Sequence, residues 1–451
     1  MKPISPLVWL RLARKPWRAS PPLLLAIGFL LLILIGGLLL KLPLAHRGEM
    51  GWLDAFFTAT SAVCITGLTT LDISTQLTPF GQWLLMLLMQ LGGLGIMTFA
   101  ALTLLLLGGR LGLGYQRLVS DAMNQTQPRD LLWLLRRICV FVLVAEGIGM
   151  GLLALRWVPE FGWGRGLYLS LFHSISAFNN AGFTLWPDSL QGSHDNTLVI
   201  LVFSLLIIAG GLGFTVVSDC WEQRRWRCLS LHSKLTLVGT GALLVGGFLL
   251  LSCIEWNNPG TLGDLSLKGK LLGGWFQSVS PRTAGFSSFD LSQLRPASVV
   301  VVILLMFVGA GTNSTGGGIK VSTMMVLLLT TRSFLAGRST PVVFGRSIGF
   351  DTIFKALAVS FLTLMLIVCG VFLLTLTDPS LPFLAELAEV VSAVSTTGLT
   401  LGLTPHRTDA GQLVLIPLMF IGRLGPLTLA FLLTRPQPSR VSYAEGEVHI
   451  G

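Results

Sequence analysis

The stretch Ser61-Ala-Val-Cys-Ile-Thr-Gly-Leu-Thr69 returns late in the chain as Ser392-Ala-Val-Ser-Thr-Thr-Gly-Leu-Thr400, identical at seven of nine positions. Two weaker copies lie between them. Ser176-Ala-Phe-Asn-Asn-Ala-Gly-Phe-Thr184 keeps both ends of the stretch, and Ser280-Pro-Arg-Thr-Ala-Gly-Phe-Ser287 keeps the second end. Similarity at nearly constant spacing is the signature of a repeat architecture. The sequence therefore predicts four copies of one unit, centred on Gly67, Gly182, Gly285 and Gly398.

The composition excludes an ordinary soluble protein. Hydrophobic residues make up 52% of the chain and charged residues 12%, whereas about a quarter of the residues in a typical soluble domain are charged. Uncharged runs of about 20 residues, enough for a helix to cross roughly 30 Å of hydrocarbon, recur along the whole length. We therefore expect one all-α integral membrane domain over residues 1–451.

Each copy reads as an apolar span, a shorter segment that ends at the glycine, and a second apolar span. The first spans are expected at 21–40, 138–155, 235–254 and 356–376, and the second spans at 80–107, 197–218, 297–330 and 413–433. The short segments are expected at 52–63, 166–178, 271–279 and 383–394. This predicts eight spans in four repeats, at 20–109, 130–220, 234–332 and 353–435, arranged pseudo-fourfold around one central pore.

The short segments cannot cross a bilayer. A short helix that stops halfway and returns is tolerated where its irregular backbone is buried in protein or lines water. Its C-terminal end carries a partial negative charge that favours a cation at the membrane centre. Each segment is therefore predicted to be a pore loop.

The glycines fit a site that strips water from an alkali cation. Backbone carbonyls can replace the hydration shell of such an ion, and glycine reaches positive φ without steric cost, so the carbonyls can face one axis. None of the four stretches contains a carboxylate, which argues against a Ca²⁺ site. Glycines that merely pack helices are the alternative, but four copies in register favour a cation filter.

The net charge of +10 reports topology rather than nucleic-acid binding. Most of the 31 Lys and Arg residues fall in segments that alternate with the repeats: 2–18, 110–137, 224–234, 332–355 and 435–440. By the positive-inside rule these segments and both termini are cytoplasmic. The six cysteines form no CxxC pair, so a zinc site or a disulfide framework is not expected.

The expected span 297–330 is interrupted by five glycines: Gly309, Gly311, Gly316, Gly317 and Gly318. Each costs about 1 kcal/mol relative to alanine in a helix. The residues between them, Thr312, Asn313, Ser314 and Thr315, offer side-chain hydrogen bonds that compete with the helical backbone. We predict that the span breaks here and forms a gate or a binding site, with a glycine-rich packing kink as the alternative.

Two charges lie in the middle of expected spans and need partners. Arg423 should face the pore or an ion pair, because a charge at that depth is costly. Glu146 is its acidic candidate, and a carboxylate satisfied between helices is the equal alternative. Arg282 is expected to brace the third pore loop, and His173 to be a packed, hydrogen-bonded histidine.

Six motifs resemble those of the Trk/Ktr/HKT superfamily of potassium transporters, in the same order. Four resemble filter loops: Thr66-Gly-Leu-Thr-Thr-Leu-Asp72, His173-Ser-Ile-Ser-Ala-Phe-Asn-Asn-Ala-Gly-Phe183, Arg282-Thr-Ala-Gly-Phe286 and Ser395-Thr-Thr-Gly-Leu-Thr-Leu-Gly-Leu-Thr404. Gly309-Ala-Gly-Thr-Asn-Ser-Thr-Gly-Gly-Gly-Ile-Lys320 resembles the intramembrane gating loop, with Gly317 where alanine is expected. Ile421-Gly-Arg-Leu-Gly-Pro-Leu-Thr428 resembles the arginine motif of the final helix. The resemblance covers nearly the whole chain and looks closest to the Ktr-type bacterial pore subunit.

The resemblance implies K⁺ uptake through a single-glycine filter made of Ile65, Thr66, Gly67, Asn180, Ala181, Gly182, Thr283, Ala284, Gly285, Thr396, Thr397 and Gly398. It implies a gate made of Gly309, Gly311, Thr312, Asn313, Ser314, Thr315, Gly316, Gly317, Gly318, Lys320 and Arg423. It further implies a homodimer in the bacterial cytoplasmic membrane, gated by a cytosolic nucleotide-binding ring of the RCK type. No covalent cofactor is expected, and Na⁺ is a candidate activator.

Two other classes of membrane protein are a secondary transporter and an intramembrane enzyme. A sodium-coupled or other secondary transporter usually shows repeats of opposite orientation, whereas the four repeats here share one orientation. An intramembrane enzyme would need a catalytic arrangement of Ser and His, paired Asp or HExxH at matching depth, and none is found in the sequence. The sequence therefore predicts a pore and not an enzyme.

Overall fold

The structure is a computed structural model that describes residues 21–106, 131–338 and 340–425. The basic segments expected at 2–18 and 435–440, most of the segment 110–137, and the end of the expected span 413–433 lie outside these residues. Regular structure in the described part is helical, apart from a hairpin of β1 (Val342–Val343) and β2 (Arg346–Ser347). Its register pairs Val342 with Ser347.

The four expected first spans form long helices: α2 (Pro21–Leu40), α7 (Leu131–Phe161), α11 (Leu231–Glu255) and α15 (Phe350–Thr377). Each is long and apolar enough to cross a membrane. Their outward faces carry large apolar side chains, such as Leu143 (66% exposed) on α7 and Phe361 (61% exposed) on α15. An apolar outer surface of this extent is what a lipid-facing helix requires.

The four expected short segments are helices that pack against the first spans: α3 (Trp52–Val63), α8 (Trp163–Phe178), α12 (Leu267–Val279) and α16 (Phe383–Ser395). Their C-terminal halves are buried almost completely. The short helix therefore ends inside the protein in each repeat, as the sequence predicted.

The second spans differ between repeats. The first and fourth contain continuous helices, α5 (Pro79–Leu106) and α17 (Asp409–Leu424). The second breaks at Gly213 into α9 (Thr197–Leu212) and α10 (Phe214–Gln223), bent by 94°, so the segment 197–218 is not one continuous helix. The third breaks into α13 (Pro296–Phe307) and α14 (Val321–Leu335), which confirms the predicted interruption.

The described residues contain four or five helical spans by length and composition. Within the described residues, four helices pass as spans on length and composition, and the bent pair α9–α10 would make a fifth. Side chains of α5 are described only as far as Gly95, and α17 ends where the description ends. The total of eight spans stays a prediction.

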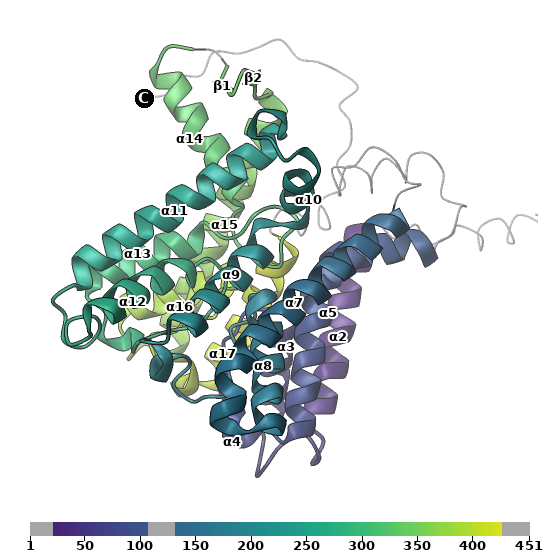
Figure 1. Cartoon of the computed structure of the whole chain (residues 1–451), viewed down its shortest axis with the longest axis vertical. Helices are drawn as coiled ribbons and strands as arrows, with labels where there is room; N and C mark the ends of the chain where they lie inside the picture. The colour runs from purple at the N-terminus through teal and green to yellow at the C-terminus, as the bar shows by residue number, and fades with distance from the viewer. Residues whose placement is uncertain (1–20, 107–130, 339, 426–451) are drawn as a thin grey trace, which may run out of the picture.

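Helices of successive repeats contact one another in sequence order. The second span α5 packs on α7 and α8, α9 packs on α11 and α12, and α13 packs on α16. The last described helix, α17, packs on α3 of the first repeat. Figure 1 shows α2, α3 and α5 beside α7 and α8, with α11 to α13 on the opposite side and α16 and α17 between.

Five short elements complete the described chain. The helix α4 (Ile73–Gln76) is capped by Asp72, whose carboxylate accepts from the backbone N–H of Ser74 at 2.9 Å. The 3-10 turns η2 (Gln191–Ser193), η4 (Leu291–Gln293) and η5 (Thr404–His406) follow the glycine segments of repeats two to four, and η3 (Trp226–Cys228) precedes α11.

Candidate functional site

Each short helix is followed by the same unusual backbone. The residue two positions before each glycine has a positive φ: 55° at Ile65, 56° at Asn180, 73° at Thr283 and 51° at Thr396. The glycines follow with φ values of 93° at Gly67, 72° at Gly182, 78° at Gly285 and 83° at Gly398. Ile and Thr are β-branched and strained at positive φ, and such strain clusters at functional sites. The same strained turn is therefore built four times.

The sign of φ alternates along each segment, because φ is not positive at the residue between the two that have a positive φ. A strand with negative φ throughout points successive carbonyls in opposite directions, and alternation turns them toward the same side. Glycine takes the second position at no steric cost. Each segment can thus present adjacent carbonyl oxygens to one side.

The four glycines form a closed ring. A Cβ added to any of them would fall against the carbonyl oxygen that precedes the next glycine around the ring: 2.7 Å from Ala181 for Gly67, 3.1 Å from Ala284 for Gly182, 2.4 Å from Thr397 for Gly285 and 2.0 Å from Thr66 for Gly398. The fourth segment thus contacts the first. We refer to the segments 65–67, 180–182, 283–285 and 396–398 together as the glycine ring.

Serines at the ends of three short helices hydrogen-bond to a ring segment or to the residue that directly follows it. Ser61 Oγ accepts from the N–H of Gly67 at 3.0 Å, and Ser176 Oγ donates to the carbonyl of Phe183 at 2.7 Å. Ser280 Oγ donates to the carbonyl of Phe286 in the same way. The fourth counterpart, Ser392, is buried with no hydrogen-bond partner for its hydroxyl in the described part of the chain.

The chain between α13 and α14, residues 308–320, lies against the glycine ring, and we call it the intramembrane loop. It begins and ends in a parallel bridge between Val308 and Ile319, where the N–H of Gly309 donates to Ile319 O at 2.9 Å. Three loop residues touch the ends of short helices or the strained turns: the N–H of Gly317 donates to Thr396 Oγ1 at 3.1 Å, Thr315 Oγ1 donates to Phe178 O at 3.4 Å, and a Cβ on Gly316 would lie 2.1 Å from Thr283 Oγ1.

The intramembrane loop also docks on the break between α9 and α10. The N–H of Gly311 donates to Gly211 O at 2.8 Å, and that of Thr315 donates to Gly210 O at 3.2 Å. In return, the N–H of Phe214 donates to Asn313 O at 3.1 Å. The backbone groups that the break at Gly213 releases are thus satisfied by the loop, as buried irregular backbone requires.

Arg423 joins the intramembrane loop to the first repeat. The side chain is 3% exposed, its Nη1 donates to the carbonyl of Thr315, and its Nη2 donates to the carbonyl of Gly92 at 2.7 Å. Arg423 therefore bonds to two backbone carbonyls, one of them in the intramembrane loop. Lys320, at the other end of the loop, donates through Nζ to Gly316 O at 2.6 Å.

Residues 29–443 match the family model described as TrkH, cation transport protein. The chain belongs to the TrkH family of cation transport proteins. It is 46% identical over 434 residues to Ktr system potassium uptake protein B of Bacillus subtilis (strain 168), covering 96% of this chain and 97% of the relative. The protein of the same name from Vibrio alginolyticus is 43% identical over 438 residues, covering 96% of both chains.

A third relative and a solved structure agree. The potassium/sodium uptake protein NtpJ of Enterococcus hirae is 40% identical over 439 residues, covering 96% of this chain and 97% of the relative. The crystal structure of the potassium transporter TrkH from Vibrio parahaemolyticus superimposes with a TM-score of 0.73 at 20% identity, covering 93% of this chain and 86% of that one. The family recognised from the motifs is thus confirmed, and it is a family of transporters, not enzymes.

Glu146 does not pair with Arg423. Its Oε2 accepts from Gln90 Nε2 at 3.2 Å and its Oε1 accepts from Asn179 Nδ2 at 3.1 Å. Asn179 Nδ2 lies 2.8 Å from Gln90 Oε1 as well. Of the two alternatives left open by the sequence, the structure favours a carboxylate satisfied between helices, by the amide side chains of Gln90 on α5 and of Asn179, which caps α8.

The other two singled-out side chains act within their own repeats. Arg282 is buried, and its Nη2 lies 3.3 Å from Thr240 Oγ1 on α11, which fits a brace for the third segment. His173 is fully buried and stacks on Trp186 with ring centroids 4.1 Å apart. Its Nδ1 donates to Leu169 O at 2.8 Å, since Nε2 accepts from a backbone N–H. The expectation of a packed histidine is confirmed.

Three glycines of the second spans were missed by sequence reasoning. A Cβ on Gly92, Gly210 or Gly422 would clash with a carbonyl oxygen at the end of a short helix, at 2.2 Å from Val63, 1.9 Å from Phe178 and 2.1 Å from Val394. These glycines let the second spans pack directly against the ends of the short helices that precede the ring segments. The signal was in the sequence, as Gly92-Gly-Leu-Gly95, Gly210-Gly-Leu-Gly213 and Gly422-Arg-Leu-Gly425.

Proposed function

We propose that this protein takes up K⁺ across the bacterial cytoplasmic membrane through a single path at the centre of the glycine ring. The observation that carries the proposal is the closed ring of four glycine segments with alternating φ. A ring of carbonyls on flexible backbone is the arrangement that substitutes for the hydration shell of K⁺. Similarity to potassium uptake proteins over nearly the whole chain supports the same ion.

The proposed arrangement is four repeats, each of two spans and one pore loop, placed pseudo-fourfold around the path. It is supported by the contacts that run from each repeat to the next and from α17 back to α3. The filter residues are those of the glycine ring. The C-terminal ends of the four short helices add partial negative charge close to the bound cation.

The proposed gate is the intramembrane loop with Arg423. The loop contacts the strained turns of two ring segments, Thr283 and Thr396, and so lies next to the proposed path. A guanidinium remains protonated at this depth and would raise the barrier to a passing cation. Opening requires Arg423 to leave the carbonyl of Thr315 or to move with it.

The proposed orientation has both termini and the loops between repeats in the cytoplasm, with K⁺ moving inward. The proposed assembly is a homodimer regulated by a cytosolic nucleotide-binding ring of the RCK type, which would contact the cytoplasmic loops. The name of the Enterococcus hirae relative includes sodium. Na⁺ is therefore the candidate activator, and a sodium-coupled or other secondary transporter is the alternative function.

Complementation tests the function directly. A bacterium that lacks its own potassium uptake systems should regain growth at low K⁺ when it produces this protein, and a cognate ring subunit should increase the effect. Na⁺ is varied in the same medium at fixed K⁺. Growth that needs Na⁺ in strict proportion to K⁺ would favour the coupled transporter, and no growth at any K⁺ limitation would reject K⁺ uptake.

A further inference from the structure

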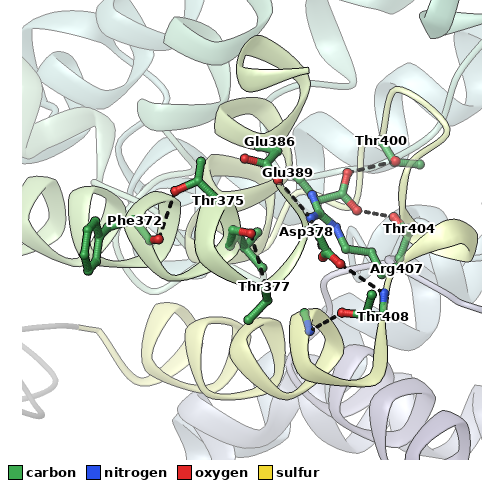
Figure 2. Close-up of polar contacts among 12 residues, drawn as sticks. Phe372, Thr375, Thr377, Asp378, Glu386, Glu389, Thr400, Thr404, Arg407 and Thr408 are labelled. Carbon is green, nitrogen blue, oxygen red and sulfur yellow. Dashed lines mark hydrogen bonds and ion pairs between the residues drawn. The ribbon is translucent and has the colours of Figure 1, made fainter. Parts of the chain in front are cut away.

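A buried carboxylate of the fourth repeat holds the chain that leaves the glycine ring. Glu389 on α16 is 0% exposed, its Oε2 accepts from Thr400 Oγ1 at 2.9 Å, and its Oε1 accepts from Thr404 Oγ1. Figure 2 shows the carboxylate facing both hydroxyls across the space between α16 and the returning chain. One side chain therefore orders the backbone from two to six residues after Gly398.

The hydroxyl of Thr400 connects the Glu389 carboxylate to the backbone of the following turn. Its Oγ1 accepts from the N–H groups of Gly402 at 3.1 Å and Leu403 at 3.2 Å. A hydroxyl that donates to a carboxylate and accepts from two amides has a fixed rotamer. The turn that follows Gly398 is thus built on the position of the Glu389 side chain.

A second anchor fixes the far end of this segment. Arg407 Nη1 lies 3.0 Å from Asp378 Oδ2 at the end of α15 and 3.6 Å from Glu386 Oε1 on α16. All three side chains are almost completely buried. Asp378 Oδ1 also accepts from the N–H of Thr408 at 3.3 Å. This ion pair ties the far end of the segment to the helices (Figure 2), and Glu389 anchors the residues nearer to Gly398 along the chain.

In the other repeats no carboxylate stands at the position of Glu389, although the partly buried Asp54 on α3 accepts from Thr70 Oγ1 at 2.7 Å, three residues after Gly67. The residues nine positions before the other ring glycines are Thr58, His173 and Phe276. His173 Nε2 accepts from the backbone N–H of Leu185 at 3.2 Å, Thr58 has no hydrogen-bond partner for its hydroxyl in the described part of the chain, and phenylalanine has no polar atom. The fourth segment, in turn, lacks the serine bond that holds the other three, because Ser392 Oγ has no such partner. Glu389 stands where that support is missing.

We propose that Glu389 is a positioning residue for the fourth ring segment and that, through Thr400 and Thr404, it sets the preference for K⁺ over Na⁺. The inference rests on the proposed function. Gly398 is the ring glycine with the closest approach to its neighbour, 2.0 Å from a Cβ to the carbonyl of Thr66. A small shift of the returning chain therefore changes the spacing of carbonyls in both segments, and carbonyls that can close inward bind the smaller Na⁺ better.

The test compares four variants in proteoliposomes: Glu389→Gln, Thr400→Val, Thr404→Val and the control Thr375→Val. Thr375 lies on α15 and its hydroxyl donates only to Phe372 O of its own helix. The measurement is ⁸⁶Rb⁺ uptake and its competition by K⁺ and by Na⁺. We expect Glu389→Gln and Thr400→Val each to lower the K⁺-over-Na⁺ ratio about tenfold, equivalent to about 1.4 kcal/mol. The maximal rate and the Thr375→Val ratio should stay unchanged.

A merely structural role would lower yield and melting temperature and leave the ratio intact, and that outcome overturns the proposal. The double variant of Glu389 and Thr400 should be no less selective than either single variant, since the two act through one contact. If Glu389→Gln does not fold, the two Thr→Val variants decide alone. A wild-type protein that transports no Rb⁺ would reject the proposed function and this inference with it, whereas normal transport with an unchanged ratio in folded variants rejects only the inference.

Discussion

The glycine ring and the intramembrane loop are both irregular backbone inside a helical protein, but they are held in opposite ways. In the ring, three segments are fixed by a serine of their own short helix, and the same turn recurs four times. The loop occurs once and is held by other repeats, through Gly211 of the second, Thr396 of the fourth, and Arg423, which also binds Gly92 of the first. The difference suggests that the ring is permanent, whereas the loop can be released by breaking a few contacts.

The ring should fail most severely when its closest approach is blocked. Replacing Gly398 by Ser puts a Cβ at a φ of 83° and 2.0 Å from the carbonyl of Thr66, so backbone must move. We expect the K⁺-over-Na⁺ ratio of Rb⁺ uptake to fall by about a hundredfold or more, since this exceeds the loss of one buried hydrogen bond. Gly285→Ser and Gly67→Ser should follow, at 2.4 and 2.7 Å from the nearest carbonyl oxygen, and Gly182→Ser, at 3.1 Å, should be the mildest.

The control for the ring is Gly151→Ser on α7, where a Cβ meets nothing within 4 Å. It should retain uptake and selectivity. Unchanged ratios in Gly67→Ser and Gly398→Ser, in protein that is extracted and monodisperse, would contradict the assignment of the filter.

The loop should give the next largest effect when it is removed. Deleting residues 312–317 takes away the bonds to Phe178, Thr396 and Arg423 and clears the proposed path. Rb⁺ uptake should rise by more than about tenfold, because several buried hydrogen bonds are lost at once, and it should depend less on the cytosolic nucleotide-binding ring, with the K⁺-over-Na⁺ ratio preserved. The amount of detergent-extracted protein serves as the control for folding. A deletion variant that folds and conducts no faster than the parent would show that the loop is not the gate.

Arg423 should show a smaller effect of the same sign. A hydrogen bond from a charged group contributes about 1.5–3 kcal/mol, so Arg423→Gln should favour the released loop and raise Rb⁺ uptake by up to about tenfold. Because Glu146 bonds to Gln90 and Asn179, Glu146→Gln should change neither this effect nor the yield of the double variant. Poor yield of Arg423→Gln that Glu146→Gln restores would instead indicate a buried ion pair.

The same comparison explains what could be predicted from the sequence. The ring segments could be predicted because the sequence contains four imperfect copies of one motif. The break after Phe307 could be predicted because five glycines lie within ten residues. The break at Gly213 was missed, and local sequence could not reveal it. Gly-Gly-Leu-Gly at 92–95 lies in the unbroken α5, yet the same four residues at 210–213 end α9. A Cβ on Gly213 would lie 2.3 Å from Thr312 O, so the break depends on the docked loop, a contact about a hundred residues away in the chain.

The contact that joins the ring to the loop should give the smallest but most diagnostic effect. Thr396 belongs to the ring, has a φ of 51°, and accepts the N–H of Gly317 through Oγ1 at 3.1 Å. Thr396→Val keeps the β-branch and the volume and removes the acceptor, which leaves a buried N–H without its partner. A neutral hydrogen bond contributes about 0.5–1.5 kcal/mol, so Rb⁺ uptake should rise by about two- to tenfold.

The neighbouring Thr397 is the matched control, because its hydroxyl is buried with no hydrogen-bond partner in the described part of the chain. Thr397→Val makes the same chemical change one residue closer to Gly398, so it should leave the response of uptake to the cytosolic nucleotide-binding ring unchanged. If the two variants alter uptake and selectivity equally, the effect belongs to the ring alone and the Thr396 contact does not transmit the state of the loop. If only Thr396→Val raises uptake, and if it adds nothing once residues 312–317 are deleted, then the state of the loop reaches the glycine ring through the Thr396 hydroxyl. No added effect is expected in the deletion variant because the bond to Gly317 cannot form in a protein without Gly317.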